Sequence, residues 1–160
     1  KIYPDPVLLK NCVSVEKVDD NFISTVSIMV DTMRAAEGIG LAAPQVGILQ
    51  RFFVCLDFDD ENKEKTIVLI NPEITKMEGR IESKEGCLSI PGFYEYVYRY
   101  EKIEIKAYDL TGKEVIYVPD GIQSVVFQHE FDHLDGILFP ERMSQIKKDI
   151  FMKKINKEFK

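Results

Sequence analysis

The sequence predicts an α+β fold in which short antiparallel β-sheets surround a central helix, with one helix near the N-terminus and one at the C-terminus. Three observations favour this fold. Apolar residues recur at three- and four-residue steps in 20–37, which is typical of a helix. Polar and apolar residues alternate in the middle of the chain, where the connections are too short for helical crossovers. A second helical pattern, at 121–134, holds the only two histidines.

The 160 residues fit a single domain, which we expect to span 1–160 with a basic helix at 141–160. The net charge of −6 argues against a surface built for DNA. No apolar run is long enough to cross a membrane, and the first residues lack the apolar segment of a secretory leader. Three cysteines at irregular spacing are typical of a reducing compartment. We therefore expect a cytoplasmic protein, with an organelle form as the alternative.

The first predicted helix begins after Asp19 and Asp20, either of which can cap its N-terminus. It should end near Gly38, because the glycines of Gly38-Ile39-Gly40 lower helix propensity. Its apolar stripe is expected to pack in the core and consists of Phe22, Val26, Met29, Val30 and Met33.

Strand signals follow this helix, at 51–58, 66–70, 93–109 and 114–118. The first of these segments is rich in aromatic and β-branched residues and leads into an acidic turn at 59–63. Asn71-Pro72 is expected to close the second, because proline cannot donate to a strand ladder. A hairpin turn at 110–113 joins the last two. These short connections predict antiparallel pairing.

The central helix is expected from Gly121 to about Leu134, with Asp120 as its N-cap and Asp135-Gly136 as its end. One face of this helix continues an apolar stripe into the two histidines, and it is formed by Ile122, Val126, His129 and His133. Both imidazoles should therefore face the protein interior.

The last helix is expected from about Met143. Its broadly periodic apolar residues are Ile146, Ile150, Met152, Ile155 and Phe159. The segment 141–160 holds seven basic and three acidic residues, on a chain that is acidic as a whole. A polyanionic partner and an ordinary solvated helix face both account for this surplus of positive charge.

The histidines lie in the pattern H-E-x-x-H, as His129-Glu130-Phe131-Asp132-His133. Positions i and i+4 share one face of a helix, so both imidazoles can bind one metal ion. Glu130, one step round the helix, can act on water bound to that metal. A solvated polar stripe is the alternative, but apolar residues flank the motif on both sides, and imidazoles are costly there unless paired or metal-bound.

A catalytic metal site needs a third protein ligand. In one large protease group a third histidine follows the motif, but Phe139 stands at that position here and the chain has no other histidine. Cys87 is the best substitute, because a thiolate next to the flexible Gly86 is a good ligand. We expect the other cysteines, Cys12 and Cys55, to be small buried hydrophobic residues.

A third notable stretch is the glycine-rich segment 38–47. Glycines allow the backbone to approach a ligand closely. Ala43 stands where a dinucleotide-binding motif requires its last glycine, so that function is given little weight. Gln45 offers an amide donor in this loop.

Together, GIGLAAPQ (38–45), EGCLS (85–89) and HEFDH (129–133) resemble the three signature motifs of the peptide deformylase family. Their order and spacing match, and Tyr3-Pro4-Asp5-Pro6 resembles the usual start of that family. The resemblance covers nearly the whole chain. It implies the removal of the formyl group from N-formylmethionyl nascent peptides, with release of formate.

The resemblance also implies roles for individual residues. Cys87, His129 and His133 would hold one divalent metal ion, Fe²⁺ natively, with Zn²⁺, Ni²⁺ or Co²⁺ able to occupy the site. Water or hydroxide on the metal would attack the formyl carbon, with Glu130 as general base and acid. The metal, the Gln45 side chain and the Leu88 backbone N–H would stabilise the oxyanion. The methionine side chain and peptide backbone would contact Ile39, Gly40, Glu85, Gly86, Ile122, Val125 and Val126.

By the same resemblance, Arg99 would hold Glu85, and Asp132 would orient a ligand or neighbouring backbone. Some relatives carry an arginine where this chain has Phe93-Tyr94, which leaves the downstream peptide preference open. The basic C-terminal helix resembles tails that dock on the ribosome in bacterial members.

Two alternatives come from other classes of protein. A zinc endopeptidase can use the same helix motif, but its usual third ligand is missing and 160 residues hardly supply an extended cleft. A non-enzymatic module with a structural metal would need a fourth cysteine or histidine ligand, and none is evident. A structural site also has no use for Glu130 or Gln45.

Overall fold

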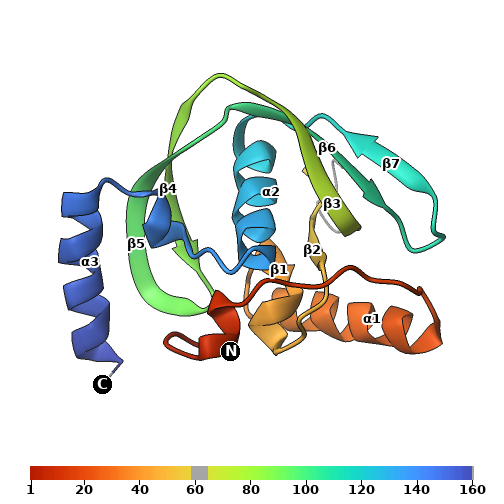
Figure 1. Ribbon diagram of the computed structural model, residues 1–160, viewed down its shortest axis with the longest axis horizontal. Helices are drawn as coiled ribbons and strands as arrows, with labels where there is room; N and C mark the ends of the chain where they lie inside the picture. Colours follow the sequence, from red (N-terminus) through yellow and green to blue (C-terminus); the bar gives the residue numbers. More distant parts are fainter. Residues whose placement is uncertain (59–64, 160) are drawn as a thin grey trace.

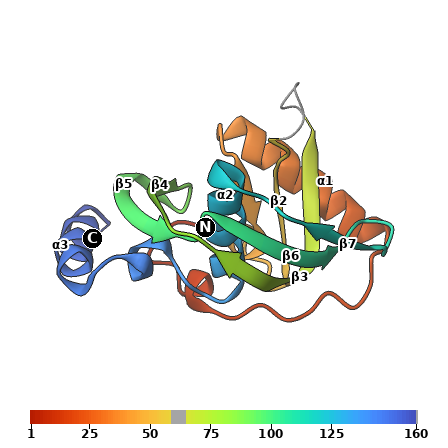
Figure 2. The ribbon, with the colours of Figure 1, turned by 90° about the horizontal axis from the view of Figure 1, so that it is seen from above.

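The computed structural model describes residues 1–58 and 65–159, so the acidic turn expected at 59–63 lies outside the described residues. Helix α2 (Gly121–Leu134) runs through the middle of the molecule, between a five-stranded and a two-stranded antiparallel sheet (Figure 1). The other two helices lie on opposite sides of the molecule (Figure 2). This arrangement confirms the predicted α+β fold, with a central helix that carries both histidines.

The larger sheet has the strand order β1-β2-β3-β6-β7, and every pair in it is antiparallel. Its strands are β1 (Gly40–Ala42), β2 (Phe52–Leu56), β3 (Thr66–Glu78), β6 (Lys102–Tyr108) and β7 (Glu114–Tyr117). The smaller sheet pairs β4 (Ile81–Cys87) with β5 (Ile90–Arg99). Strands β1 and β4 are therefore edge strands among the described residues, and both lie beside α2.

Strand β3 corrects one prediction, because Asn71-Pro72 does not end it. Asn71 adopts a left-handed backbone with φ of 50°, and the pairing register to β6 shifts between Ile70 and Glu73. The Asn71 amide replaces lost ladder bonds: its Oδ1 accepts from the Val15 N–H at 2.8 Å, and its Nδ2 donates to the Val15 carbonyl at 2.9 Å. The proline thus sits in a β-bulge, where its missing donor is tolerated.

Helix α1 (Asp20–Ala35) begins as the sequence predicts, because Asp19 Oδ1 accepts a hydrogen bond from the Phe22 N–H at 3.0 Å. The expected stripe packs against β1 and β2, although Val30 is only half-buried. The described residues also form three short 3₁₀ helices: η1 (Pro6–Leu9), η2 (Ala43–Val46) and η3 (Phe139–Arg142).

Helix α2 is buried along most of its length, which explains why it is apolar on more than one face. Phe127 packs edge-on against Phe53 and Tyr117, with ring centroids 5.8 and 5.9 Å apart. Asp120 occupies the N-cap position, but its side chain accepts no hydrogen bond from the helix, so the capping prediction is wrong in that respect. The helix ends at the expected residue.

Helix α3 (Gln145–Glu158) packs on β5 and η3 through the rings of Phe93, Phe139 and Phe151 and through Ile155. Of the periodic apolar residues in this helix, Ile155 is buried, whereas Ile146 and Ile150 are 75% and 54% exposed. Within the described parts of the chain, no helix has the length and apolar character needed to cross a membrane.

Candidate metal centre and active site

Three potential metal ligands converge where β4 ends against α2. His129 and His133 lie one turn apart on the helix, and Cys87 is the last residue of β4. Their ligand atoms all lie within 4.8 Å of one another, and Cys87 Sγ is 3.3 Å from His133 Nε2. Two imidazoles and one thiolate form a donor set that suits Zn²⁺ and other divalent transition metals.

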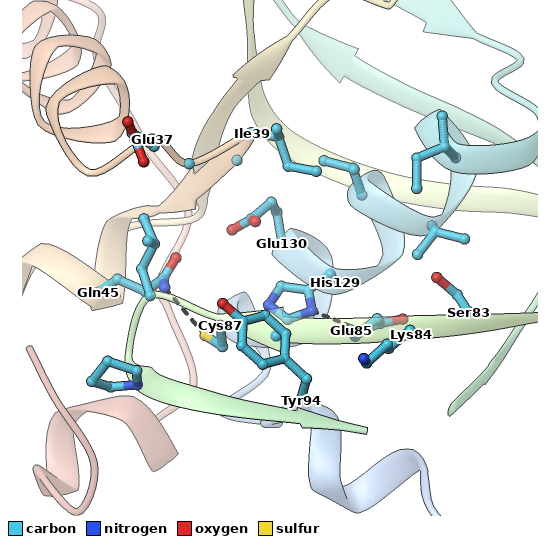
Figure 3. Close-up of a pocket in the computed structure, with 18 of the residues that line it drawn as sticks. Glu37, Ile39, Gln45, Ser83, Lys84, Glu85, Cys87, Tyr94, His129 and Glu130 are labelled. Atoms are coloured by element: carbon cyan, nitrogen blue, oxygen red, sulfur yellow. Dashed lines mark hydrogen bonds and ion pairs between the residues drawn. The ribbon is translucent and has the colours of Figure 1, made fainter. Parts of the chain in front are cut away.

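The β4–β5 hairpin brings Cys87 to the helix. The pairing register shifts between Gly86 and Cys87, which turns the end of β4 toward α2. Gly86 lets the ring of Tyr94 pack against the strand here, since a Cβ at Gly86 would lie 2.4 Å from that ring. Tyr94 therefore lies over the strand at the front of the site (Figure 3).

The electrostatics of the three residues favour metal binding. Burial opposes ionisation of Cys87, but the charge of His133 and hydrogen bonds with both histidines hold the pKa of the thiol well below its usual value. A lowered pKa favours the thiolate, the form that binds metals. The other cysteines differ: burial raises the pKa of Cys12 to about 11 and that of Cys55 well above its ordinary value. Cys55 is fully buried, as expected, whereas Cys12 is partly exposed.

Glu85 orients the imidazole ring of His129. Glu85 Oε2 lies 2.8 Å from His129 Nδ1, which leaves Nε2 as the ring nitrogen available to a metal. Arg99 binds the same carboxylate in a bidentate pair, at 2.7 and 2.9 Å. Burial raises the pKa of Glu85, but the hydrogen bonds from Arg99 and His129 outweigh that effect and lower it to about 2. The expectation that Arg99 holds Glu85 agrees with this geometry.

Glu130 faces the pocket from α2. Burial raises the pKa of its carboxyl group to about 7, against the opposing charges of His129 and His133. Its Oε2 is buried without a hydrogen-bond partner among the described residues, as is His133 Nδ1. Gly40 on β1 leaves room for this carboxylate, because a Cβ there would lie 2.4 Å from Glu130 Oε1. An unpartnered buried carboxylate beside three metal ligands fits a site that binds a metal and a reacting molecule.

Gln45 reaches the site from η2. Its Oε1 accepts from the Ala42 N–H at 2.8 Å, which fixes the amide orientation. Its Nε2 then donates toward Ser89 Oγ at 3.1 Å and toward Cys87 Sγ at 3.5 Å. Figure 3 shows the side chains of Gln45, Cys87, His129 and Glu130 around one open space. The amide donor is thus held in place before any ligand enters.

A pocket of about 400 Å³ opens onto this group. Its volume is typical of small-molecule sites. Val125 and Val126 are buried in its wall, while Ile39 and Ile122 are 43% and 53% exposed at its mouth. Every residue named from the sequence as substrate-binding or catalytic lines this pocket: Ile39, Gly40, Gln45, Glu85, Gly86, Leu88, Ile122, Val125, Val126 and Glu130.

Comparisons with known proteins agree with this site. The polypeptide deformylase family model matches residues 1–149. The chain belongs to the peptide deformylase family. The peptide deformylase of Thermodesulfovibrio yellowstonii is 45% identical over 154 residues, 96% of this chain and 93% of its own length. The chain is therefore an enzyme, a hydrolase of the peptide deformylase type, which leaves no support for the endopeptidase alternative.

Solved deformylase structures share the fold. That of the Thermus thermophilus peptide deformylase has a TM-score of 0.91 at 41% identity and covers 99% of this chain and 92% of its own. The Legionella pneumophila peptide deformylase has a TM-score of 0.89 at 40% identity, with coverages of 98% and 91%. The role of the family is the deformylation of nascent peptides.

Three residues near the deformylase site received no role from the sequence. Ser89 is buried and accepts the hydrogen bond from Gln45. Tyr94 lines the pocket. Arg142 binds both oxygens of Asp132, at 2.9 and 2.5 Å. Ser89 lies within a signature motif, but nothing in the local sequence marks Arg142.

Proposed function

We propose that this chain removes the formyl group from N-formylmethionyl peptides, with Cys87, His129 and His133 as the ligands of one divalent metal ion. The observation that carries the proposal is the convergence of these three ligands beside a buried carboxyl group with a pKa of about 7. The reaction adds water to the formyl carbon and breaks its bond to the methionine nitrogen. The products are formate and a free methionyl N-terminus.

The donor chemistry fits several metals. One thiolate and two neutral imidazoles suit Zn²⁺, and they also accept Fe²⁺, Ni²⁺ and Co²⁺. We propose Fe²⁺ as the native ion, on the resemblance to the family. When bound, such an ion lowers the pKa of water and polarises a carbonyl group.

Glu130 is proposed as the group that moves the proton. Its carboxylate faces the open space beside His129, and one of its oxygens has no hydrogen-bond partner in the described part of the chain. A pKa of about 7 suits a group that must accept and return a proton near neutral pH. Glu130 accepts the proton of the attacking water and passes it to the methionine nitrogen as the C–N bond breaks.

Gln45 and Leu88 are proposed to stabilise the negative charge that develops on the formyl oxygen. The Gln45 amide is fixed by Ala42 before the substrate arrives, so no reorganisation is needed during the reaction. Leu88 would contribute its backbone N–H, directly after Cys87. Removing one such donor typically costs about 3 kcal/mol in the activation free energy.

The pocket wall suits the methionine side chain. Val125 and Val126 provide an apolar surface next to His129. Strands β1 and β4 meet this pocket with unpaired edges, so Ile39, Gly40 and Gly86 can pair with the backbone of an extended peptide. Glu85 and Ile122 line the same pocket, which supports their proposed contact with the substrate.

The remaining proposals concern the whole chain. We propose that residues 1–160 form one catalytic domain that acts in the cytoplasm, with an organelle form as the alternative. Helix α3 leaves most of its lysines exposed, with Phe151 and Ile155 packed on the body. This supports a contact between the C-terminal helix and the ribosome, a polyanionic surface.

The test is formate release from a formylmethionyl dipeptide by protein purified anaerobically, with its metal content measured. We expect formate release that depends on one metal ion per chain, and loss of activity in air would support iron. In Glu130→Gln, release should fall by about a thousandfold with unchanged metal content. Glu82→Gln, an exposed carboxyl group on β4, is the matched control and should keep full activity.

Comparable formate release by Glu130→Gln would contradict the proposed mechanism. Activity restricted to unformylated peptides would contradict the proposed substrate and favour a peptidase.

A further inference from the structure

A continuous chain of buried ion pairs connects the metal centre to the C-terminal part of the molecule. It starts at His129, whose Nδ1 contacts Glu85, and passes to Arg99. Arg99 Nη1 then donates to Asp132 Oδ2 at 2.6 Å. The side chains of Glu85, Arg99 and Asp132 are only 3–6% exposed, so each charge depends on its neighbours in the chain.

Arg142 on η3 is the outer end of this chain. It binds both oxygens of Asp132, with Nε donating to Oδ2 at 2.9 Å and Nη2 to Oδ1 at 2.5 Å. This bidentate pair fixes the plane of the carboxylate. Arg142 itself is 43% exposed, and among the described residues it forms no hydrogen bond or ion pair with the three ligands. It is the only contact of Oδ1 that the described residues provide through a side chain.

The charges in this chain alternate: Glu85 is negative, Arg99 positive, Asp132 negative and Arg142 positive. With Arg142 removed, Asp132 would keep a single partner, Arg99, and could rotate about its side-chain bonds. Arg99 would then be the one arginine left to pair with two carboxylates, Glu85 and Asp132. Its bidentate hold on Glu85 would loosen, and the Glu85 contact sets the orientation of His129.

Element η3 also contacts His129 directly. Phe139, the first residue of η3, stacks on the His129 ring, with centroids 6.2 Å apart and an interplanar angle of 26°. One end of this short element thus contacts the His129 ring directly, and its other end is linked to His129 only indirectly, through the ion-pair chain. A shift of η3 would disturb both.

We infer that Arg142 is a positioning residue for the metal centre, acting through Asp132, Arg99 and Glu85 on the orientation of His129. The inference rests on the proposed metal site. It assigns the C-terminal element η3 a role in metal binding, although η3 provides no ligand.

The chain offers a matched control in Arg51. Its Nη1 binds Asp135 Oδ1 at 2.5 Å, and its guanidinium lies over the Phe131 ring, 4.9 Å from the centroid. Arg51 therefore stabilises the same end of α2 as Arg142 does, through the same kind of ion pair. Among the described residues, neither Arg51 nor Asp135 forms a hydrogen bond or ion pair with Glu85 or His129. Loss of this pair should therefore weaken the helix end without reorienting a ligand.

The experiment compares Arg142→Gln, Arg142→Lys and Arg51→Gln with the unaltered chain. Zn²⁺ affinity is measured by competition with a chelator, ligand geometry by the visible absorption of the Co²⁺-loaded protein, and stability by thermal unfolding of the metal-free protein. Arg142→Gln should lower Zn²⁺ affinity about tenfold and change the Co²⁺ spectrum. The Zn²⁺ affinity of Arg142→Lys should lie between those of Arg142→Gln and the unaltered chain, because an ammonium group cannot hold both oxygens of Asp132 in a bidentate pair.

Arg51→Gln should lower the unfolding temperature but keep the affinity and spectrum of the unaltered chain. Unchanged affinity and spectrum in Arg142→Gln would overturn the inference, as would an equal loss in Arg51→Gln. If Arg142→Gln fails to fold, Arg142→Lys decides in the same way. A failure of the unaltered chain to bind any divalent metal would overturn the proposed metal centre itself, which distinguishes the two failures.

Discussion

Glu85 and Glu130 are two buried carboxyl groups on either side of His129, with exposures of 6% and 4%, yet their pKa values shift in opposite directions. The pKa of Glu85 falls to about 2, and that of Glu130 rises to about 7. Burial disfavours the charged form of both. The difference lies in their partners: Glu85 accepts hydrogen bonds from Arg99 and His129, whereas Glu130 Oε2 has none among the described residues.

This contrast separates the two sides of the site by task. The β4 side holds a permanent charge that orients a metal ligand, and the cost of burying it is offset by a bidentate cation. On the side that faces β1, the carboxyl group of Glu130 has a pKa near neutral pH, so it can accept and release a proton. Equal burial therefore serves opposite purposes, and the hydrogen-bond partners decide which.

The largest effect is expected on stability, from removing the charge of Glu85 on β4. Glu85→Gln would keep the side-chain volume but leave Arg99 buried with Asp132 as its only charged partner. Removing one member of a buried ion pair typically costs about 3–5 kcal/mol in the free energy of unfolding. Urea unfolding of the metal-free protein at neutral pH measures this loss.

A surface carboxylate provides the control. Glu104 pairs with Lys76 at 2.7 Å, but water solvates that pair, so Glu104→Gln should leave the unfolding midpoint unchanged. Equal losses in Glu85→Gln and Glu104→Gln would show that the buried network contributes no more than an exposed pair.

The next effect concerns the pH dependence that Glu130 imposes on the metal-free protein. Its folded pKa of about 7 exceeds the ordinary value of 4.5, so the folded state binds the extra proton between these two pH values. The free energy of unfolding therefore falls as pH rises through this window, by up to about 3 kcal/mol. Glu130→Gln lacks this titration and should be the more stable protein at pH 8, by about that amount.

Urea unfolding of both metal-free proteins at pH 5 and pH 8 checks this sign. The two proteins should differ little at the lower pH and separate at the higher one. A constant difference at both values would mean that the Glu130 carboxyl group has an ordinary pKa in the folded protein.

Local patterns were sufficient to predict the helices. The periodicity of α1 and of α2, and the Asp19 cap, depend on neighbours within one or two turns. The spacing of His129 and His133 also identified their shared face. The third ligand is different, because Cys87 lies on another element, and only elimination and the family resemblance pointed to it.

The remaining features depend on contacts that are distant in sequence. Strand β4 was not predicted, because polar residues dominate 81–87 and its strand character comes from pairing with β5. Strand β3 continues past Pro72 because the Asn71 amide bonds to Val15, 56 residues away. Arg142 was missed for the same reason: its partner Asp132 belongs to another element, and no local pattern joins them.

The smallest of these effects, and the one that sharpens the comparison most, concerns how Glu130 is oriented. Glu85 is oriented by hydrogen bonds, whereas one oxygen of Glu130 lies against Gly40, where a Cβ would come within 2.4 Å. Gly40→Ala should displace the carboxylate and lower kcat for formate release by about 100-fold, or about 2.7 kcal/mol in activation free energy, because misplacement by about 1 Å has that cost. Metal content should not change, since the atoms that lie nearest to a Cβ at Gly40 all belong to Glu130, which is not a proposed ligand. Gly112→Ala is the control. Gly112 has φ of 78°, and a Cβ there would meet no atom within 4 Å, so the substitution should lower stability through backbone strain alone. If Gly40→Ala keeps full activity, the carboxylate has another support, and its position does not depend on the fit against β1.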